Sequence, residues 1–249
     1  MDSFVALSKA SKDALKIATL SASLPINSII TGPKAVGKNH LAKVVAPNAK
    51  SYTASSLQNS IKDKTINLDA INEIIVLDIH KLSSISHLLE SLDAKNIKVV
   101  ATSIEYKEHY CDFFQAHIKV PALSERKEDV EYLKDEYIKE AKRIFLIDEE
   151  INSNIELDLS NNAISLKKSI FRNILFDSLT KSDIMNILEK FLLKEFEKSS
   201  SYKELLPIFE TPLLRAGKKR YKSQLQMAKH FKINRNTLRK KFIENKIDE

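Results

Sequence analysis

The sequence predicts an α/β fold: a parallel five-stranded sheet with flanking helices, then further helices, then a small all-α unit at the C-terminus. Short apolar runs rich in Ile and Val alternate with stretches of helical periodicity as far as Pro121. Beyond Pro121 the periodic segments have helical spacing, and basic side chains concentrate near the C-terminus. Strands that alternate with helices are typical of a parallel sheet.

The first half of the chain supplies the expected strands and their connecting helices. A first helix is expected over residues 9–20, with its inner side formed by Ala10, Ala14, Ile17 and Ala18. The expected strands are residues 28–31, 51–53, 73–77, 98–102 and 117–120. The runs 74–77 and 98–101 are rich in consecutive β-branched residues, which is typical of strands covered on both faces.

The second half is expected to be helical. The periodicity predicts helices over residues 125–145, 166–179 and 182–197, and Ser182 with Asp183 suits the start of the last of these. Residues 198–201 read Lys-Ser-Ser-Ser and are the best linker candidate. A small helical unit is expected from Tyr202 onwards.

A phosphate-loop pattern follows the first strand. The segment TGPKAVGKN places Gly32, Gly37 and Lys38 in the spacing G-x-x-x-x-G-K, between an expected strand and an expected helix. Glycines let successive backbone N–H groups point into one concavity, and the lysine reaches the β- and γ-phosphates. The predicted nucleotide-binding residues are Gly32, Gly37, Lys38, Asn39 and Asp78.

Nucleotide hydrolysis is not expected. The position after Lys38 should offer a hydroxyl to Mg²⁺, and it is Asn39. Asp78 ends the third expected strand, but Ile79 follows it where a carboxylate would orient water. We therefore predict no catalytic residue and no required cofactor. Two alternatives stay open: the loop binds ATP or ADP, or it is vestigial and only shapes the fold.

The charge of the chain is unevenly distributed. Residues 215–246 hold 12 Lys or Arg and one acid, although the net charge of the whole chain is only +7. Such a concentration of positive charge attracts polyanions. The single cysteine, Cys111, excludes a disulfide framework and is expected to be inert. The sequence shows no signal peptide and no membrane span, so a cytoplasmic protein is expected. Its six histidines lack metal-ligand spacing, so no metal site is expected.

The basic segment predicts two short helices joined by a tight turn. Ala228 is small where the helices cross, Leu238 and Phe242 form an inward apolar pair, and Asn234 suits the N-cap of the second helix. Asn and Arg side chains near the start of a helix are what readout of the DNA major groove uses. The predicted DNA-binding residues are Ser223, Gln224, Asn234, Arg235, Asn236, Thr237, Arg239, Lys240 and Lys241. Lysines and arginine within 218–222 are expected to hold further phosphates. The alternative is a basic helical hairpin that contacts protein.

At these residues the chain resembles the Fis-type helix-turn-helix domain. Residues 233–241, INRNTLRKK, are similar to its recognition helix, and residues 210–214, ETPLL, are similar to the start of its long dimer-forming helix. The body resembles, more distantly, the AAA+ domain of NtrC-type enhancer-binding proteins. Residues 118–130, IKVPALSERKEDV, are similar to a characteristic segment of that family. The resemblance implies the strand order 5-1-4-3-2, and domains at 1–142 (AAA+-like α/β), 143–198 (helical lid) and 202–249 (helix-turn-helix).

Departures from the NtrC pattern bear on activity. The family contacts sigma-54 through a GAFTGA loop, and residues 54–72 are too short for it and contain no glycine or phenylalanine. The positions of the family's arginine fingers are Tyr106 and Asp112, and the sensor-two position is Lys167. Loss of such a finger costs other NTPases about 10³–10⁵ in rate. The TyrR-like branch, which lacks GAFTGA, is the better analogue.

The sequence and the resemblance therefore predict a nucleoid-associated, sequence-specific transcription regulator that dimerises around residues 212–216 and reads double-stranded DNA with its helix-turn-helix. Its degenerate AAA+ body is expected neither to hydrolyse nucleotide nor to activate sigma-54. RNA polymerase is a further candidate partner. Two alternatives are kept: an ATP-dependent AAA+ transcription activator, and a Fis-like architectural protein that bends DNA with low specificity.

Overall fold

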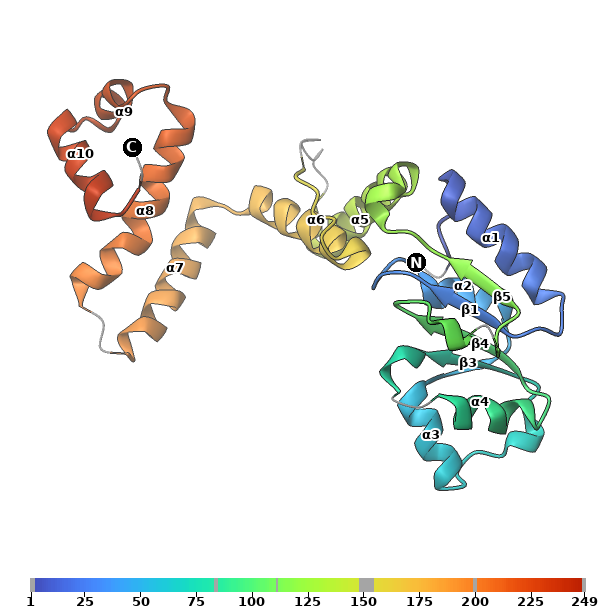
Figure 1. Cartoon of the computed structure of the whole chain (residues 1–249). Coiled ribbons are helices and arrows are strands. Elements are labelled where there is room, and N and C mark those ends of the chain that lie inside the picture. The colour runs from blue at the N-terminus through green and yellow to red at the C-terminus, as the bar shows by residue number, and fades with distance from the viewer. Residues whose placement is uncertain (1–2, 83–84, 111, 148–154, 199–200, 248–249) are drawn as a thin grey trace. The chain divides into compact units, whose positions relative to one another are not determined.

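The computed structural model describes residues 3–82, 85–110, 112–147, 155–198 and 201–247. The chain divides into two compact units, Met1–Ser178 and Leu179–Glu249 (Figure 1). Cys111 and residues 199–200 of the predicted linker lie outside the described residues. In the described part of the chain, no helix has both the length and the apolar character needed to cross a bilayer.

The first unit is built on one parallel sheet. Its strands are β1 (Ser28–Thr31), β2 (Lys50–Thr53), β3 (Glu73–Leu77), β4 (Lys98–Ser103) and β5 (Ala116–Lys119). Their order is β2-β3-β4-β1-β5, which confirms the expected order, and each strand agrees with its predicted range to within one residue. In the register, Ile29 lies between Ala101 of β4 and His117 of β5.

Alternate side chains of the strands supply two cores, one on each face of the sheet. On one face Ile74, Val76 and Val99 pack with the leucines of α3 (Ala54–Lys62) and α4 (Ser86–Asp93). On the other, Ile75 and Val100 pack with α1 (Lys9–Ala22) and α2 (Lys38–Val45). Burial on both faces explains why the middle residues of β3 and β4 are apolar. Short 3₁₀ turns occur at η1 (Leu68–Ala70), η2 (Ile79–Lys81), η3 (Glu108–Tyr110) and η4 (Leu123–Glu125).

The inner face of α1 differs from the prediction. Its buried residues are Ser11, Ala14, Ala18 and Ser21, whereas Ile17 is 41% exposed. The helix packs against α2, and small side chains allow the two backbones to approach closely. The prediction for Ile17 is therefore wrong, because the close approach of α1 and α2 selects small side chains and not the most hydrophobic ones.

Two helices complete the first unit. In α5 (Lys127–Phe145) and α6 (Asn162–Ser178), Val130 and Leu133 pack against Leu166 and Ile170 in a third apolar core. Helix α5 begins two residues later than predicted, because residues 123–125 form the turn η4. Helix α6 begins four residues earlier than predicted.

The second unit contains α7 (Lys181–Phe196), α8 (Tyr202–Arg220), α9 (Gln224–Phe231) and α10 (Arg235–Glu244). The N-cap of α7 is Thr180, which forms a capping box with Asp183, so Ser182 does not start the helix as predicted. Helix α8 starts at Tyr202, well before the expected start near residues 210–214, and Pro212 lies inside it. Helix α7 was expected in the lid at 143–198 but groups with the second unit.

One buried ion pair ties three segments of the first unit together. Arg126 is 1% exposed and Asp129 is fully buried, and Arg126 Nε donates to Asp129 Oδ2 over 2.7 Å. The other carboxylate oxygen of Asp129 accepts the backbone N–H groups of Leu7 and Ser8, at 2.6 and 2.9 Å. Burial raises the pKa of the Asp129 carboxyl, but these hydrogen bonds, with those from Ser11 and Arg126, hold it below its usual value.

The guanidinium of Arg126 has two further acceptors. Its terminal nitrogens donate to the carbonyl oxygens of Val36 and Val5, over 2.9 and 3.0 Å, and the group lies 5.2 Å from the ring centroid of Phe4. Arg126 thus joins the N-terminal segment, the loop after β1 and the start of α5.

We expect Arg126→Leu to lower the free energy of unfolding of the first unit by about 3–5 kcal/mol, because it leaves the Asp129 carboxylate buried without its cation. Urea-dependent hydrogen exchange of peptides from α5 measures this unit separately from the second. The matched control is Lys127→Leu, at the exposed neighbouring position, for which a change within about 0.5 kcal/mol is expected. Equal effects from the two substitutions would contradict the role given to the ion pair.

Candidate functional site

The predicted phosphate loop lies between β1 and α2, and its backbone carbonyls are hydrogen-bonded from outside the loop. Lys38 Nζ donates to the carbonyl oxygens of Gly32 and Pro33, over 2.6 Å each. Asn162 Nδ2, at the start of α6, donates to the carbonyl oxygen of Lys34 over 2.9 Å. The lid therefore contacts the loop directly.

The next two carbonyls of the loop have partners as well. The N–H of Ala163 donates to Ala35 over 3.2 Å, and Arg126 donates to Val36. Five consecutive carbonyls, from Gly32 to Val36, are therefore engaged by the protein. Ala35 and Gly37 are left-handed, at φ 58° and 98°, directly before the right-handed turn of α2. Alternating left- and right-handed residues make the nest of N–H donors that binds phosphate.

Both loop positions that are glycine require it. A Cβ on Gly32 would lie 2.1 Å from the carbonyl oxygen of Val120, which is backbone and cannot rotate away. A Cβ on Gly37 would lie 2.9 Å from the ring of Phe4, and the φ of +98° disfavours any side chain. The loop conformation thus accounts for two of the three glycines in the chain.

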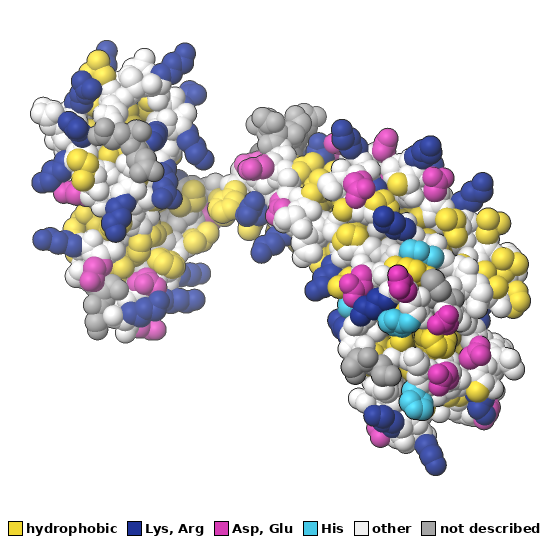
Figure 2. Space-filling view, in the orientation of Figure 1, with side chains coloured by type: hydrophobic (Ala, Val, Ile, Leu, Met, Phe, Trp, Pro, Cys, Tyr) yellow, Lys and Arg dark blue, Asp and Glu magenta, His cyan; other side chains and the backbone are white. Residues whose placement is uncertain are grey.

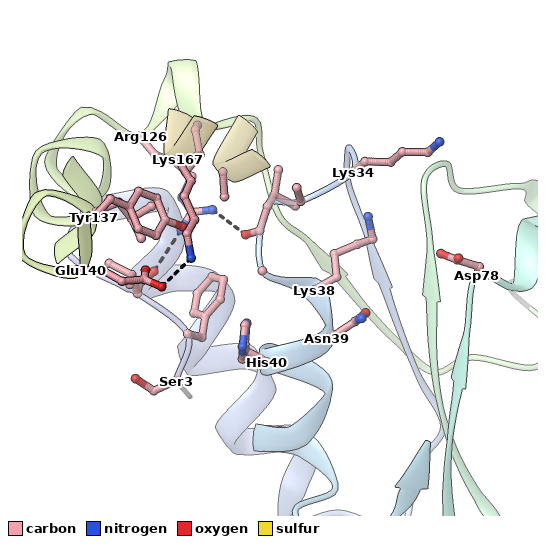
Figure 3. Close-up of a pocket in the computed structure, with 18 residues that line it drawn as sticks. Ser3, Lys34, Lys38, Asn39, His40, Asp78, Arg126, Tyr137, Glu140 and Lys167 are labelled. Carbon is pink, nitrogen blue, oxygen red and sulfur yellow. Dashed lines mark hydrogen bonds and ion pairs between the residues drawn. The ribbon is translucent and has the colours of Figure 1, made fainter. Parts of the chain in front are cut away.

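A pocket of about 490 Å³ opens beside the loop (Figure 3). This volume is within the range of small-molecule sites. The loop and the start of α2 line one side, and the N-terminal segment, α5 and α6 line the other. Its lining includes Phe4, Lys38, Asp78, Tyr137, Glu140 and Lys167.

Charge in the pocket centres on Lys38, which is only 7% exposed. Burial lowers the pKa of its ammonium, and Asp78, which faces it from the end of β3, acts in the opposite direction (Figure 3). Asp78 also forms an ion pair of 2.6 Å with Lys81, and its backbone N–H donates to Thr102 Oγ1 over 3.1 Å. The predicted residue Asn39 is exposed at the first turn of α2.

The positions expected to support hydrolysis carry other side chains. Ile79, after Asp78, is fully buried. Tyr106 stacks on the ring of His117, with centroids 4.1 Å apart, and His117 shares a hydrogen bond of 2.6 Å with Thr31. Asp112 is exposed. None of these groups is a guanidinium.

Lys167 lies in the pocket wall, where the resemblance implies a sensor-two cation. Its Nζ is 2.7 Å from Glu140 Oε1 and lies near the rings of Tyr137 and Phe171. Sequence reasoning missed Glu140, Asn162 and Arg126 at this site. No sequence signal identifies Glu140. Asn162 has a left-handed φ of 50°, a conformation that Asn tolerates better than most residues, so the residue type is the one hint that the sequence offers there.

In the second unit, α9, α10 and the end of α8 close around an apolar core formed by Leu214, Met227, Ala228, Leu238 and Phe242. Lys232 ends α9 in a left-handed conformation, at φ 52°, a position that glycine commonly occupies at the end of a helix. The remaining glycine, Gly217, is where α8 meets α9, since a Cβ there would lie 2.4 Å from the end of the Met227 side chain.

Two predicted DNA-binding residues cap helices. The Asn234 side chain accepts the N–H of Asn236 over 2.8 Å, so Asn234 is the N-cap of α10, as predicted. The Ser223 hydroxyl caps α9 by accepting the N–H of Gln226. Gln224 is half-buried at the start of α9.

The exposed side of α10 is polar and cationic. Its exposed residues include Arg235, Asn236, Thr237, Arg239 and Lys240. Lysine and arginine side chains surround this unit in Figure 2. Lys241 is half-buried, and its ammonium is paired with Glu210 of α8. Among the described residues, no group of three His, Cys, Asp or Glu side chains could hold a metal ion.

No protein-family model matches this sequence, and no curated protein is significantly similar to it. The structure is similar to that of NtrX from Brucella abortus in complex with ADP, with a TM-score of 0.59 and 15% identity over 98% of this chain and 69% of that chain. The NtrX structure in complex with ATP gives a TM-score of 0.55 at 14% identity, covering 97% of this chain and 68% of that one. Together with the parallel sheet and its phosphate loop, this likeness shows that the chain contains an AAA+ P-loop fold.

Proposed function

We propose that this protein is a dimeric, sequence-specific DNA-binding transcription regulator whose AAA+ body binds nucleotide without hydrolysing it. The observation that carries the proposal is the exposed side of α10, where two arginines, an asparagine and a threonine stand on a helix held by an apolar core. A helix that served only to pack would not present this combination outward. Arg is suited to guanine O6 and N7, and Asn to adenine N6 and N7.

The surroundings of α10 supply the positive charge that DNA requires. The last turn of α8 contributes Lys218, Lys219 and Arg220, and Lys222 follows it. Such side chains neutralise phosphates and position the protein, whereas base contacts give specificity. The N-cap at Asn234 fixes where α10 starts, and Arg235 and Asn236 lie in its first turn.

We expect Arg235→Ala and Arg239→Ala each to weaken binding to the best DNA sequence selected in vitro by about 1–3 kcal/mol, because each removes a base contact. Titration of labelled DNA at fixed salt measures the loss. The control is Lys203→Ala, which removes one exposed cation at the start of α8. Equal affinity of the wild type for selected and random DNA would contradict sequence reading and favour the architectural alternative.

Dimerisation is supported by apolar side chains of the second unit that have no cover. No residue of α7 is buried, and all of the helix lies among the described residues. Its apolar side chains Ile184, Phe191 and Phe196 are each 45% or more exposed. Phe209 and Leu213 of α8 are 59% and 45% exposed. Apolar surface on this scale is typical of a protein interface, and yellow side chains gather over these helices in Figure 2. A second copy would present the same apolar surface in return.

We expect the full chain to sediment as a dimer and Leu213→Glu to sediment as a monomer, because a carboxylate at the interface would be buried without a partner. DNA affinity should fall together with the dimer, since a monomer reads only one half-site. Ile243→Glu is the control, because Ile243 is 66% exposed but lies on α10 rather than on α7 or α8. A wild type that stays monomeric at the concentrations where it binds DNA would contradict the proposal.

Nucleotide binding is supported by the fit of the loop to phosphate. The loop offers a nest of N–H groups, the cation of Lys38 and the N-terminus of α2, and the adjacent pocket has aromatic and apolar walls at Phe4 and Tyr137. The Lys38 ammonium donates to two loop carbonyls, which are neutral acceptors. The phosphate of a bound nucleotide would give it an anionic acceptor. Asn39 and Ile79 stand where hydrolysis would require a hydroxyl and a carboxylate.

We expect the chain to bind a fluorescent ATP or ADP analogue and to release no phosphate above background. Lys38→Ala should weaken binding at least about tenfold, because it removes a charge-assisted hydrogen bond to phosphate. The control Lys50→Ala removes an exposed cation on β2 and should leave binding unchanged. Phosphate release that DNA stimulates and that Lys38→Ala abolishes would contradict the absence of hydrolysis and favour the ATP-dependent activator.

A further inference from the structure

A cluster of four polar side chains joins α8 to α10. Lys241 and Asn245 of α10 meet Glu210 and Thr211 of α8. The Lys241 ammonium donates to Glu210 Oε1, and Asn245 Nδ2 lies 3.4 Å from Glu210 Oε2. Thr211 Oγ1 donates to Asn245 Oδ1 over 2.7 Å. Asn245 Nδ2 also donates to the carbonyl oxygen of Lys241 over 2.9 Å, which holds its amide in place. We call these four residues the α8–α10 clamp.

The clamp is more than a surface ion pair. The side chains of Lys241 and Glu210 are only 33% and 17% exposed, and the hydrogen bond from Lys241 is the main reason that the pKa of Glu210 lies below its usual value. Charge-assisted hydrogen bonds are shorter and more directional than apolar contacts. The apolar core beside the clamp, which includes Leu214, Leu238 and Phe242, is stabilised by the hydrophobic effect, which is not directional.

The place of the clamp on α8 connects it to the proposed dimer. Glu210 and Thr211 lie between Phe209 and Leu213, the exposed apolar residues that share one side of the helix. Because successive helical residues turn by about 100°, Thr211 lies opposite that side, whereas Glu210 lies at its edge, about 80° from the midpoint between Phe209 and Leu213. The exposed apolar side of α8 and the clamp are therefore neighbours, and Leu213 lines the same small pocket as Glu210 and Lys241.

We propose that the α8–α10 clamp fixes the orientation of the recognition helix against the dimer helix, and that it thereby sets the half-site spacing that the dimer accepts on DNA. The inference rests on the proposed function. Two recognition helices of a dimer enter grooves about 34–36 Å apart, so a small rotation of each helix changes the spacing that fits best. Lys241 is then a positioning residue and not a phosphate contact.

The test measures binding of the full chain to a set of DNAs that carry the same two half-sites at different separations. The wild type should prefer one spacing sharply. Glu210→Gln and Lys241→Met should each reduce the discrimination against a spacing altered by one base pair, by about tenfold, which is the effect of losing a charge-assisted bond. Exchange of the two charges, by Glu210→Lys with Lys241→Glu, should restore most of the discrimination.

The matched control is Lys240→Met, at the neighbouring exposed lysine. If Lys240 contacts phosphate, its loss should reduce the slope of log affinity against log salt by about 0.9 and leave the spacing preference intact. Lys241→Met should do the reverse. A reduced salt slope for Lys241→Met, together with unchanged spacing preference for Glu210→Gln, would overturn the clamp and make Lys241 a phosphate contact.

Hydrogen exchange of α10 in the absence of DNA separates failure of the clamp from failure of the proposed function. Glu210→Gln should speed the exchange of α10 amides relative to α9, and the charge exchange should slow it again. Unchanged exchange overturns the clamp even if DNA is read specifically. Faster exchange in a chain that selects no paired half-sites supports the contact between the helices but overturns both its role in spacing and the proposed function.

Discussion

The first unit depends on one arrangement: the backbone carbonyls of the loop after β1 are all hydrogen-bonded by groups outside it. Lys38 closes the start of the loop, Asn162 and Ala163 hold its middle, and Arg126 holds its end. A buried backbone carbonyl without a partner costs free energy comparable to a lost hydrogen bond. Lys38, the start of α6 and Arg126 therefore satisfy the loop carbonyls. The Arg126–Asp129 ion pair links the loop to the N-terminal segment, because Arg126 donates to Val36 and Val5 and Asp129 accepts from Leu7.

The second unit holds the short helix α10 against α8 and α9 and leaves one side of it exposed. Its core is small, so capping and polar contacts contribute much of the definition of α10. Asn234 fixes where the helix starts, and Glu210 fixes how it lies against α8. A helix held at its start and along its flank can present arginines at constant positions, which base readout needs. This division of roles explains why Lys241, despite its charge, faces inward.

Local patterns in the sequence predicted the sheet, the phosphate loop and the capping of α10, because each follows from neighbouring residues. The order of the strands was implied by resemblance, and the structure confirms it. Contacts between distant residues could not be predicted in this way. Asn162 and Lys34 are 128 positions apart, and Glu210 and Lys241 are 31 apart, so no periodicity reports them. Ile17 was misplaced because helix–helix approach selects small side chains, which hydrophobicity does not show. The DNA-reading role itself stays a prediction.

The two hydrogen bonds from the start of α6 to the loop have a mechanical consequence. Asn162 and Ala163 bind carbonyls of Lys34 and Ala35, directly beside the residues that would meet a phosphate. Any shift of these peptide planes changes the anchor of α6, whose far end closes the first unit at Ser178. A ligand that binds two positions of the loop with different affinities would therefore also shift the position of α6.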